Sequence, residues 1–441
     1  MASYSSGAPH TPNAEMTLPK SFDFGGKPVG QPARAFRTSI VPRSGSQFGG
    51  SKLIQIDIPA GNPGVFMDPS TSYLQFAIAN GSAHAMELDA SAASVIEKID
   101  VYMGSVHLSS MNQYAVYHSL IFDNQVSLSD KLTSYTQLIG AKPLTMPAAY
   151  NAVDVETAVH QRKGQTIAVN SGGTFCLPLL NVLGTMSQRA IPLGQLRDDI
   201  RVDITLNPTA YWGVWTNATP TFTNVYLTNV KLQCAMIELA SHVTAGLDGA
   251  LGGRYAMPIM DVRHYSTTVG ANSGAINYLL PARVSSASAV FVTMRASADV
   301  TTADATKQTL TKRTRGTMTS YSWRLGAHRM PQIPVVTDTN IDPYLTEARM
   351  ELARAFQSVG LAAQPSSLSQ GQWVTDGFAV GLSLDSFAHM NELMSDGVSL
   401  LNSHLYFEAT LAANNPALVV DFFVLFDKVV VCEGGLLSYA E

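Results

Sequence analysis

The chain has 441 residues, more than one ordinary hydrophobic core accommodates, which predicts two or three domains. Hydrophobic residues make up 46% of the sequence, so intrinsic disorder is excluded for most of the chain. Charged residues make up only 14%, well below the roughly 25% of typical soluble domains, and we expect much of the surface to be covered in an assembly. The formal net charge of −5 excludes a globally basic nucleic-acid-binding protein.

The cysteines and the termini give no sign of export or of a membrane span. Cys176, Cys234 and Cys432 form no CxxC pair, and an odd number argues against a disulfide framework. The N-terminus, MASYSSGAPHTPNAEM, lacks the apolar run of a signal peptide. The apolar run Ala417 to Cys432 contains three charged residues and is too short to span a bilayer. We therefore expect a soluble intracellular protein, or one that joins a particle assembled inside a cell.

Residues 1–50 differ from the rest of the chain. They are rich in Gly, Pro and Ser and have almost no apolar periodicity, which predicts a flexible N-terminal arm. The formal charge is +4 up to position 52 and −9 beyond it. One interpretation is an arm that reaches a neighbouring subunit or an acidic surface, and the other is a frayed terminus. The basic residues assigned to such an arm are Lys20, Lys27, Arg34, Arg37 and Arg43.

From Lys52 to Leu239 the sequence is typical of short β-strands between turn signals. In KLIQIDIP, three isoleucines alternate with Leu, Gln and Asp, which predicts a strand with one face in a core. Further strands are expected at Ser72–Asn80, Val95–Leu108 with a hairpin turn at Gly104-Ser105, Thr166–Val169, Thr174–Leu180, Arg201–Asn207 and Val225–Leu239.

One helix interrupts these strands. Tyr114, Tyr117, His118 and Ile121 recur at positions i, i+3, i+4 and i+7, which predicts a helix of about three turns. The serine pair at 109–110 precedes it and is expected to cap its N-terminus.

A glycine-rich stretch, HVTAGLDGALGG, predicts a linker at residues 243–254 between two halves of the chain. Strands resume after it, interrupted by one strong helix that begins with the N-cap and N1 pair Asp342-Pro343 and ends at Gly360. The apolar stripe of this helix consists of Leu345, Ala348, Leu352, Phe356 and Val359.

The two halves resemble each other in their closing strands. The first half ends with three successive strand segments, GTFCLPLL, RDDIRVDITL and NVYLTNVKLQCAMIEL. The second half ends with three similar segments, DGFAVGLSL, NSHLYFEATL and LVVDFFVLFDKVVVCEGG. Phe175 and Leu206 are 31 positions apart, and Phe378 and Leu411 are 33 apart. Many short strands with few helices, repeated twice, predict two β-sandwich domains of similar topology.

Motifs for catalysis, metal binding or phosphate binding are missing from the sequence, so we expect no enzyme and no cofactor. Adjacent Asp198 and Asp199 point to opposite faces of a strand, which favours a turn or cap role over paired carboxylates. Lys312, Arg313 and Arg315 form a tight basic cluster that could contact nucleic acid or a neighbouring subunit. A solvated loop is the preferred interpretation of this cluster.

The element order carries a resemblance to a known family. Three segments are similar to the first jelly roll of double jelly-roll major capsid proteins. They are SYLQFAIAN, the following VIEKIDVYMGSVHLSSMNQYAVY, and the later TFCLPLLNVLGTMSQRAIPLGQLRDDIRVDITLN. INYLLPARVSSASAVFVTMR and VVDFFVLFDKVVVCEGG resemble the opening and closing of the second. The family comprises the capsid proteins of tectiviruses, adenovirus (the hexon), large DNA viruses and virophages or Polintons. The resemblance spans roughly residues 52–441.

This resemblance implies an all-β fold of two consecutive eight-stranded jelly-roll β-sandwiches with a few short helices in loops. The implied organisation is an arm at 1–50, jelly rolls at 51–242 and 255–441, and the linker between them. The implied function is a viral major capsid protein that forms homotrimers with a pseudo-hexagonal outline and tiles an icosahedral shell in the virion, assembled inside the host cell. Its partners would be neighbouring capsomers, minor capsid or vertex proteins and, through the arm, an internal membrane or the genome. No small-molecule substrate is implied.

Two features are candidates for subunit contacts: the loop AYWGVW, with Tyr211, Trp212 and Trp215, and the helix around Leu352 and Phe356. The aromatic loop also supports a different hypothesis, a carbohydrate-binding or hydrolytic β-sandwich protein, since such sites expose aromatic side chains. A minor shell or vertex protein is a third hypothesis, and the duplicated strand order counts against it.

Overall fold

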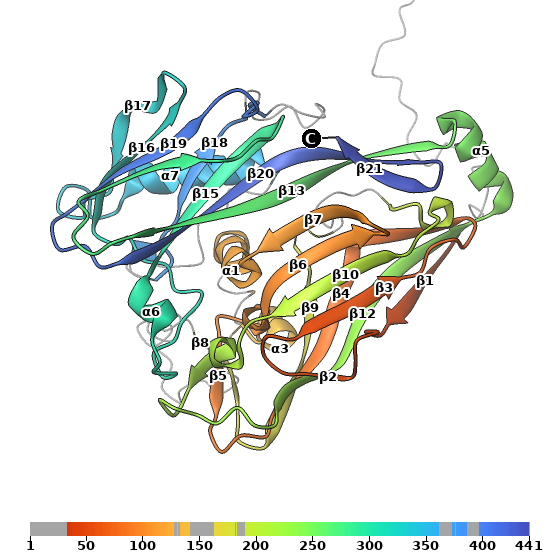
Figure 1. The fold of residues 1–441 in the computed structure, drawn as a ribbon, viewed down its shortest axis with the longest axis horizontal. Helices are drawn as coiled ribbons and strands as arrows, with labels where there is room; N and C mark the ends of the chain where they lie inside the picture. Colours follow the sequence, from red (N-terminus) through yellow and green to blue (C-terminus); the bar gives the residue numbers. More distant parts are fainter. Residues whose placement is uncertain are drawn as a thin grey trace, which may run out of the picture.

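A computed structural model describes residues 33–127, 130, 133–141, 163–180, 182, 190–360, 373–374, 376–385 and 397–440. The chain forms two β-sandwiches that lie side by side (Figure 1). Among the residues described, no helix is long and apolar enough to cross a membrane.

The first sandwich consists of two antiparallel four-stranded sheets with short additions. One sheet has the order β1 (Ala33–Ile40), β12 (Val225–Leu239), β4 (Val65–Asn80), β9 (Ser171–Pro178), with β2 (Gln47–Phe48) also paired to β12. The facing sheet has the order β3 (Leu53–Ile58), β10 (Ile200–Leu206), β6 (Ile96–Met103), β7 (Val106–Asn112). A small third sheet contains β11 (Gly213–Trp215), β5 (Met86–Asp89) and β8 (Lys163–Ile167).

The second sandwich is also built from two antiparallel four-stranded sheets. One has the order β13 (Arg254–Val269), β20 (Leu418–Glu433), β15 (Ala287–Ala296), β18 (Val380–Ser383), and β21 (Leu436–Ala440) pairs with β20. The other has the order β14 (Ala275–Leu280), β19 (Leu405–Leu411), β16 (Met318–Leu325), β17 (His328–Val336).

The two sandwiches have the same topology. One sheet of the first sandwich, β1-β12-β4-β9, corresponds in chain order and sheet position to β13-β20-β15-β18 of the second. The facing sheet, β3-β10-β6-β7, corresponds in the same way to β14-β19-β16-β17. In each sandwich the hairpin β6–β7 or β16–β17 is followed by a helix, α1 or α7. The predicted fold of two consecutive jelly rolls is therefore confirmed.

Five α-helices lie in the described part of the chain, outside the sheets: α1 (Tyr114–Gln125), α3 (Ser134–Ile139), α5 (Ser241–Leu251), α6 (Ser297–Thr301) and α7 (Thr346–Ser358). Short 3₁₀ turns occur at Ala92–Val95, Leu193–Gln195 and Thr209–Trp212.

Each core forms between the two sheets of a sandwich, from side chains at alternate positions. Ile54, Ile56 and Ile58 of β3 are at most 1% exposed, as their alternation predicts. In the second sandwich, Phe422 of β20 stacks on Tyr278 of the facing sheet at 4.8 Å between ring centroids. Burial of such side chains contributes roughly 1.5–3 kcal/mol each to folding.

Part of the predicted N-terminal arm belongs to the first jelly roll. Ala33–Ile40 is a strand that pairs antiparallel with β12 over eight residues, and Gln47–Phe48 also pairs with β12. The expectation that residues 1–50 form one flexible arm is therefore wrong for the described part. An edge strand needs few apolar side chains because its main chain supplies the pairing, so hydrophobic periodicity did not reveal it.

The linker and one helix cap also differ from expectation. Ser241–Leu251 forms helix α5, so the glycine-rich connection between β12 and β13 is largely helical. The serine pair at 109–110 lies within β7, and α1 begins after Gln113, which adopts a left-handed conformation at φ 52°. By contrast, the turn at Gly104-Ser105 joins β6 to β7 as predicted, with Gly104 at φ +56°.

The helix predicted after Asp342-Pro343 is present as α7, shifted by one turn. Asp342 Oδ2 accepts hydrogen bonds from the Thr346 main-chain nitrogen at 2.7 Å and from its hydroxyl at 2.9 Å. This carboxylate therefore caps the first turn as its position in the sequence indicates.

Candidate assembly surfaces

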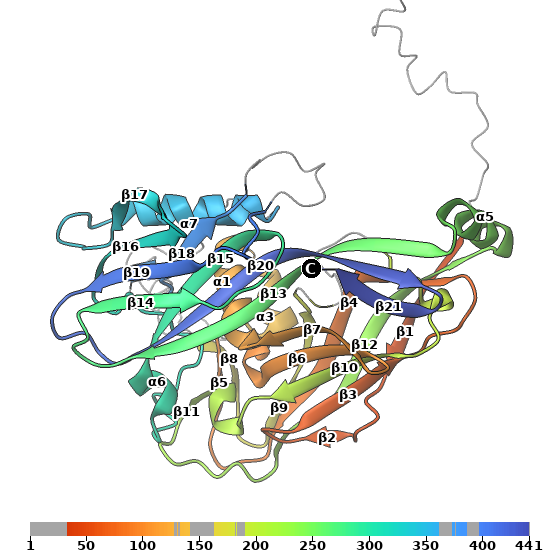
Figure 2. The same cartoon turned by 45° about the horizontal axis from the view of Figure 1, so that its top comes forward.

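One contact within the molecule joins the two jelly rolls. Strand β7 and helix α1 of the first face β13, β20 and β21 of the second (Figures 1 and 2). At the centre of this contact, the rings of Tyr117 in α1 and Phe423 in β20 lie 5.4 Å apart, and both side chains are fully buried. Buried apolar contacts of this kind hold the two jelly rolls together.

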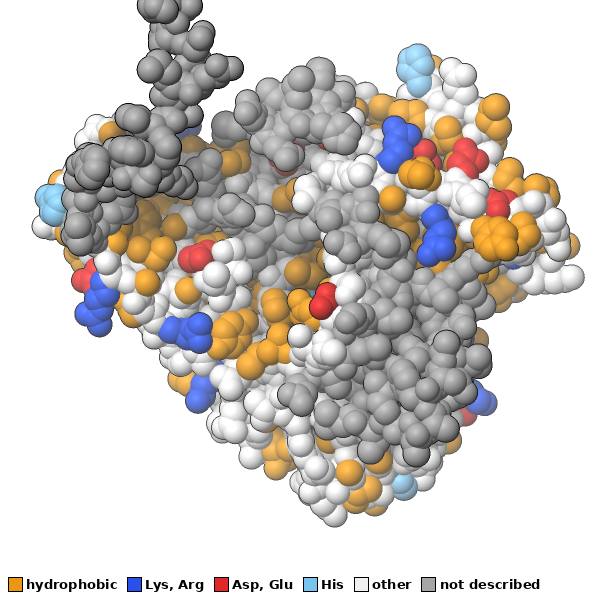
Figure 3. All heavy atoms as spheres, turned by 180° about the vertical axis from the view of Figure 1, so that it is seen from behind, with side chains coloured by type: hydrophobic (Ala, Val, Ile, Leu, Met, Phe, Trp, Pro, Cys, Tyr) orange, Lys and Arg blue, Asp and Glu red, His pale blue; other side chains and the backbone are white. Residues whose placement is uncertain are grey.

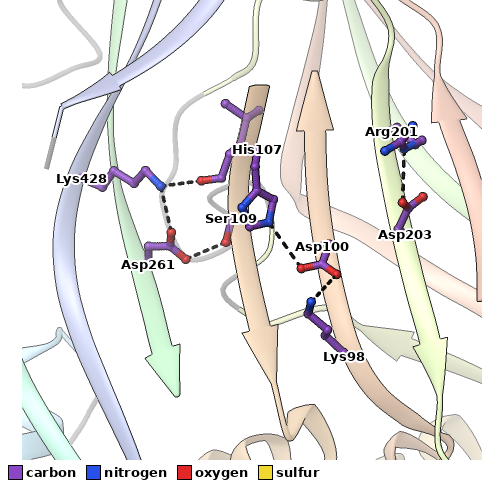
Figure 4. A network of polar contacts seen from close by, with 9 residues as sticks. Lys98, Asp100, His107, Ser109, Arg201, Asp203, Asp261 and Lys428 are labelled. Carbon is purple, nitrogen blue, oxygen red and sulfur yellow. Dashed lines mark hydrogen bonds and ion pairs between the residues drawn. The ribbon is translucent and has the colours of Figure 1, made fainter. Parts of the chain in front are cut away.

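A buried polar group crosses the same contact (Figure 4). Lys428 Nζ in β20 lies 3.2 Å from Asp261 Oδ2 in β13 and also donates to the main-chain carbonyl of Leu108 in β7. Ser109 of β7 donates its hydroxyl to Asp261 Oδ1 at 2.7 Å. Lys428 and Asp261 are at most 4% exposed, and buried charges are tolerated only when paired and hydrogen-bonded in this way.

The basic cluster that the sequence singled out lies at this contact. Arg313 is 0% exposed, donates to Asp123 Oδ2 of α1 at 2.5 Å and donates to Ser119 Oγ at 3.0 Å. The preferred interpretation of the cluster as a solvated loop is therefore wrong for Arg313. Asp123 and Ser119 lie 190 and 194 positions earlier in the sequence, so local spacing could not reveal these two partners.

The other two members of the cluster are also held within the chain. Lys312 Nζ lies 3.3 Å from Asp299 Oδ2, and Arg315 donates to the main-chain carbonyls of Met318 at 2.7 Å and Thr337 at 2.5 Å. Neither side chain is fully exposed, so the cluster does not form a basic surface for nucleic acid.

The loop before this cluster packs on the small sheet of the first jelly roll. Asp89 of β5, 1% exposed, accepts from the main-chain nitrogens of Leu310 at 2.6 Å and Thr311 at 2.9 Å, and from the Thr311 hydroxyl at 2.6 Å. Trp215 of β11 donates its main-chain N–H to the Ala305 carbonyl at 3.1 Å. These hydrogen bonds form a second contact between the jelly rolls.

A buried polar triad in the second jelly roll contacts the same loop. Asp421 of β20 lies 2.9 Å from His264 Nε2 and 2.8 Å from Arg295 Nε, and Arg295 also donates to the Leu310 carbonyl at 3.3 Å. Burial by itself raises the pKa of the Asp421 carboxyl, but the charge of Arg295 and the hydrogen bond from His264 outweigh it. The pKa of Asp421 therefore lies below its ordinary value.

The aromatic loop AYWGVW is an internal structure. Trp212 and Trp215 are 0% and 1% exposed, and Trp212 Nε1 donates to the Asn207 carbonyl at 2.8 Å. Tyr211 is partly exposed and donates its hydroxyl to the Val300 carbonyl of α6. The expectation that both tryptophans form a subunit contact is wrong, and the glycan-binding hypothesis loses the exposed aromatic side chains on which it depended.

The side of helix α7 that carries Leu352 and Phe356 packs on its own sandwich. Both side chains are buried, at 3% and 2% exposure, and Phe356 stacks on Phe291 of β15 at 4.6 Å. Their assignment to a subunit contact is therefore wrong. The exposed side of α7 instead carries Met350, which is 63% exposed.

The basic residues assigned to the arm divide into two groups. Lys20 and Lys27 lie outside the described residues. Arg34 and Arg37 are exposed side chains of β1, and the Arg37 guanidinium donates to the Tyr73 hydroxyl at 3.3 Å. They therefore belong to the surface of the first jelly roll.

Arg43 follows β1 and is also held on the first jelly roll. Its guanidinium lies 3.0 Å from Asp57 Oδ2 of β3, with the Arg43 side chain 64% exposed. Exposed pairs of this kind contribute at most about 1 kcal/mol.

Sequence reasoning missed the most exposed apolar side chains of the described part. The five largest exposures among large hydrophobic residues belong to Ile333 (79%), Ile341 (72%), Val41 (64%), Met350 (63%) and Tyr344 (60%). Four of them lie on β17, on α7 or between these elements, and Figure 3 shows hydrophobic side chains at this end of the second jelly roll, at upper right. Clusters of exposed apolar side chains mark interaction sites.

The described residues contain no group of three or more His, Cys, Asp and Glu side chains that could hold a metal ion. The geometry instead provides two joined jelly rolls, with exposed apolar side chains among polar ones at the β17–α7 end of the second.

Comparison with known proteins gives matches in structure only. No protein-family model matches the sequence, and no curated protein matches it. The chain is similar to the capsid protein in the quasi-atomic model of the PBCV-1 virus capsid, with a TM-score of 0.61 and 11% identity over 93% of this chain and 97% of that one.

Two further solved structures are similar over comparable lengths. The Faustovirus major capsid protein matches with a TM-score of 0.60 and 10% identity, covering 96% of this chain and 94% of that one. The mavirus major capsid protein matches with a TM-score of 0.52 and 10% identity, covering 100% and 96%. At these identities the matches show a shared double jelly-roll fold across the whole chain.

Proposed function

We propose that this chain is a viral major capsid protein that forms homotrimeric capsomers with a pseudo-hexagonal outline, which tile an icosahedral shell in the virion. The observation that supports this most directly is the presence of two jelly rolls of the same topology held together by buried contacts. Three such chains present six sandwiches of the same topology around one axis, so they approximate six-fold symmetry.

The composition and the exposed apolar end support self-association. Interfaces of permanent assemblies are poor in charge and rich in apolar side chains, and the chain carries only 14% charged residues. The role is structural, without enzymatic activity, a cofactor or a small-molecule substrate. Assembly takes place inside the host cell.

The arm, now limited to residues 1–32, is proposed to contact a neighbouring capsomer. Arg34, Arg37 and Arg43 belong to the first jelly roll, and the 32 residues before it contain two basic and two acidic side chains. A formally neutral arm has no electrostatic preference for an acidic membrane surface or a genome. A contact with another capsomer, or with a minor capsid or vertex protein, therefore accounts better for it.

Light scattering of the purified chain, with negative-stain images of the same peak, tests the proposal. We expect a particle of three times 47.2 kDa, 141.6 kDa, with a hexagonal outline. A monodisperse monomer of 47.2 kDa at all protein concentrations would contradict it.

A further inference from the structure

Lys428 and Asp261 bring an amine and a carboxyl together inside the second jelly roll (Figure 4). Strands β13 and β20 pair antiparallel, and their register places Asp261 two positions from the residue opposite Lys428. The two side chains are therefore diagonal neighbours on the same face of the sheet. Lys428 Nζ lies 3.2 Å from Asp261 Oδ2. The fold thus holds the two components of an amide bond beside each other.

The two oxygens of the Asp261 carboxyl have different partners. Oδ1 accepts from the Ser109 hydroxyl at 2.7 Å and from the Val262 main-chain nitrogen at 2.9 Å, whereas Oδ2 faces Lys428 Nζ. Two fixed donors on one oxygen stabilise the negative charge that a carbonyl oxygen acquires when a nucleophile attacks its carbon. Oδ1 is therefore suited to carry this charge, and Oδ2 is suited to leave.

The amine of Lys428 is held in one direction by groups other than Asp261. Nζ also donates to the Leu108 main-chain carbonyl of β7, and the Tyr439 ring of β21 has its centroid 4.0 Å away. These contacts occupy other sides of the nitrogen. An amine that passes its proton to Oδ2 therefore presents its lone pair toward the Asp261 carboxyl.

The surroundings disfavour charge at this position. Lys428 and Asp261 are 3% and 4% exposed. A cavity of about 30 Å³ borders Asp261 and Ser109 and is otherwise lined by apolar side chains of both jelly rolls, such as Leu108, Ile200 and Met257. Transfer of one proton from Nζ to Oδ2 gives a neutral pair, which avoids the cost of burying two charges. The cavity also has room for a released water molecule.

We propose that Lys428 and Asp261 condense to an isopeptide bond that joins β20 to β13. After proton transfer from Nζ to Oδ2, the neutral amine attacks Cγ and forms the Nζ–Cγ bond. Ser109 and Val262 donate to the negative Oδ1 of the intermediate. The Cγ–Oδ2 bond then breaks, and Oδ2 leaves as water with its own proton and one from the nitrogen. The products are one amide and one water, and the reaction uses no oxidant or cofactor.

The position of the bond gives it a place in the folding of the chain. Ser109 and the Leu108 carbonyl belong to the first jelly roll, so we expect the bond to form after the two jelly rolls dock. It joins residues 167 positions apart, in the opening strand β13 and the late strand β20 of the second jelly roll. The intact bond therefore prevents the separation of these two strands.

Mass spectrometry of the purified full-length chain tests the inference. After denaturation and digestion with trypsin, we expect a branched peptide in which Lys428 is joined to Asp261. Its mass should be about 18 Da below the sum of its two linear parts, because one water is lost. Lys428→Arg keeps the charge and the hydrogen-bond donors but lacks the amine nucleophile, so its digest should contain only linear peptides.

A second variant tests the role assigned to the hydroxyl of Ser109 as a positioning group. Ser109→Ala removes one of the two donors to Asp261 Oδ1. The branched peptide should therefore appear at least about tenfold more slowly than in the wild type, over a time course of cell-free synthesis. An unchanged rate would overturn the assignment of Oδ1 as the oxygen that carries the charge.

Lys98 and Asp100 provide a matched control within the same chain (Figure 4). Their charged groups lie 2.9 Å apart in β6, closer than those of Lys428 and Asp261, but the Lys98 side chain is 36% exposed. Water stabilises the charged forms of an exposed pair, so this pair should stay unlinked in the same digest.

Three results would overturn the inference. The first is a wild-type digest in which Lys428 and Asp261 occur only in linear peptides. The second is a loss of 18 Da carried by a linear peptide, which indicates a cyclic imide at an aspartate. The third is a link between Lys98 and Asp100 in equal yield, because burial would then play no part. The wild-type digest decides the matter even where Lys428→Arg does not fold.

Discussion

Helices α1 and α7 follow corresponding hairpins in the two jelly rolls and have different surroundings. Helix α1 packs on β6 and the 3₁₀ turn Ala92–Val95, whereas α7 packs on β15 and β18. The sequence of α1, YAVYHSLIFDNQ, has one formally charged side chain, Asp123, and this side chain pairs with a buried arginine of the other jelly roll. The sequence of α7, TEARMELARAFQS, has four, and its exposed side carries an ion pair in solvent. The difference teaches that the same topological position serves as core when a second jelly roll covers it and as surface when none does.

The largest expected loss of stability comes from removing the buried ion pair of α1. Arg313→Ala removes a buried cation 2.5 Å from the buried Asp123 carboxylate, so the free energy of unfolding should fall by about 3–5 kcal/mol in guanidinium denaturation. Arg354→Ala removes the exposed pair on α7 and should cost less than about 0.5 kcal/mol. Equal losses in the two variants would show that the two helices do not differ as described.

Substitutions on the buried and the exposed sides of α7 should give the second largest difference in stability. Leu352→Ala opens a cavity against the second jelly roll and should lower the free energy of unfolding by about 3 kcal/mol. Met350→Ala, on the exposed side, should change it by less than about 0.5 kcal/mol in the monomer. Thermal denaturation of the two variants at a concentration where both are monomeric makes the comparison, and a larger loss for Met350→Ala would reverse the assignment of faces.

The pH dependence of stability tests the buried polar triad, which belongs to the second jelly roll. Because the pKa of Asp421 is lower in the folded state, its charge stabilises the fold above the unfolded pKa and loses this effect as pH falls through the folded pKa. Asp421→Asn should therefore be less stable than the wild type at pH 7, and the gap should shrink below about pH 4, by at most about 1.4 kcal/mol per pH unit. Denaturation curves from pH 7 to pH 2 measure the difference in stability between the wild type and the variant. A difference that does not change with pH would contradict the lowered pKa of Asp421.

Two truncations should give the smallest effect on folding and sharpen the boundary of the arm. Deleting residues 1–32 should change the free energy of unfolding by less than about 0.5 kcal/mol and leave trimers intact, while shell formation is impaired. Deleting residues 1–45 also removes β1, which pairs with β12 over eight residues, and should destabilise the chain. Normal shells from the shorter deletion, seen by negative stain, would exclude a role of the arm in assembly.

The sequence was sufficient for the fold because period-two alternation is a local signal. The isoleucines of β3 and the apolar stripe of α7 are buried as their spacing indicates. Strand β1 was missed because both Arg34 and Arg37 are exposed on this edge strand, so its apolar alternation is weak.

The candidate surfaces were less predictable because they depend on what covers an element. Spacing shows that α7 has an apolar side, but it does not show whether that side faces its own sandwich or a neighbour, and Leu352 and Phe356 were misassigned for this reason. Arg313 was misjudged because its partner Asp123 lies 190 positions away. Exposure of Ile333 or Met350 has no sequence signal at all.

Helix α5, which joins the jelly rolls covalently, has a consequence for the kinetics of assembly. A contact within one chain forms at a fixed effective concentration, whereas a contact between chains follows mass action. In a closed ring of three chains, half of the six contacts between sandwiches are present before any two chains meet. Diluting the protein therefore weakens only the other half, and a capsomer taken apart by dilution should dissociate into intact pairs of sandwiches that are ready to reassemble.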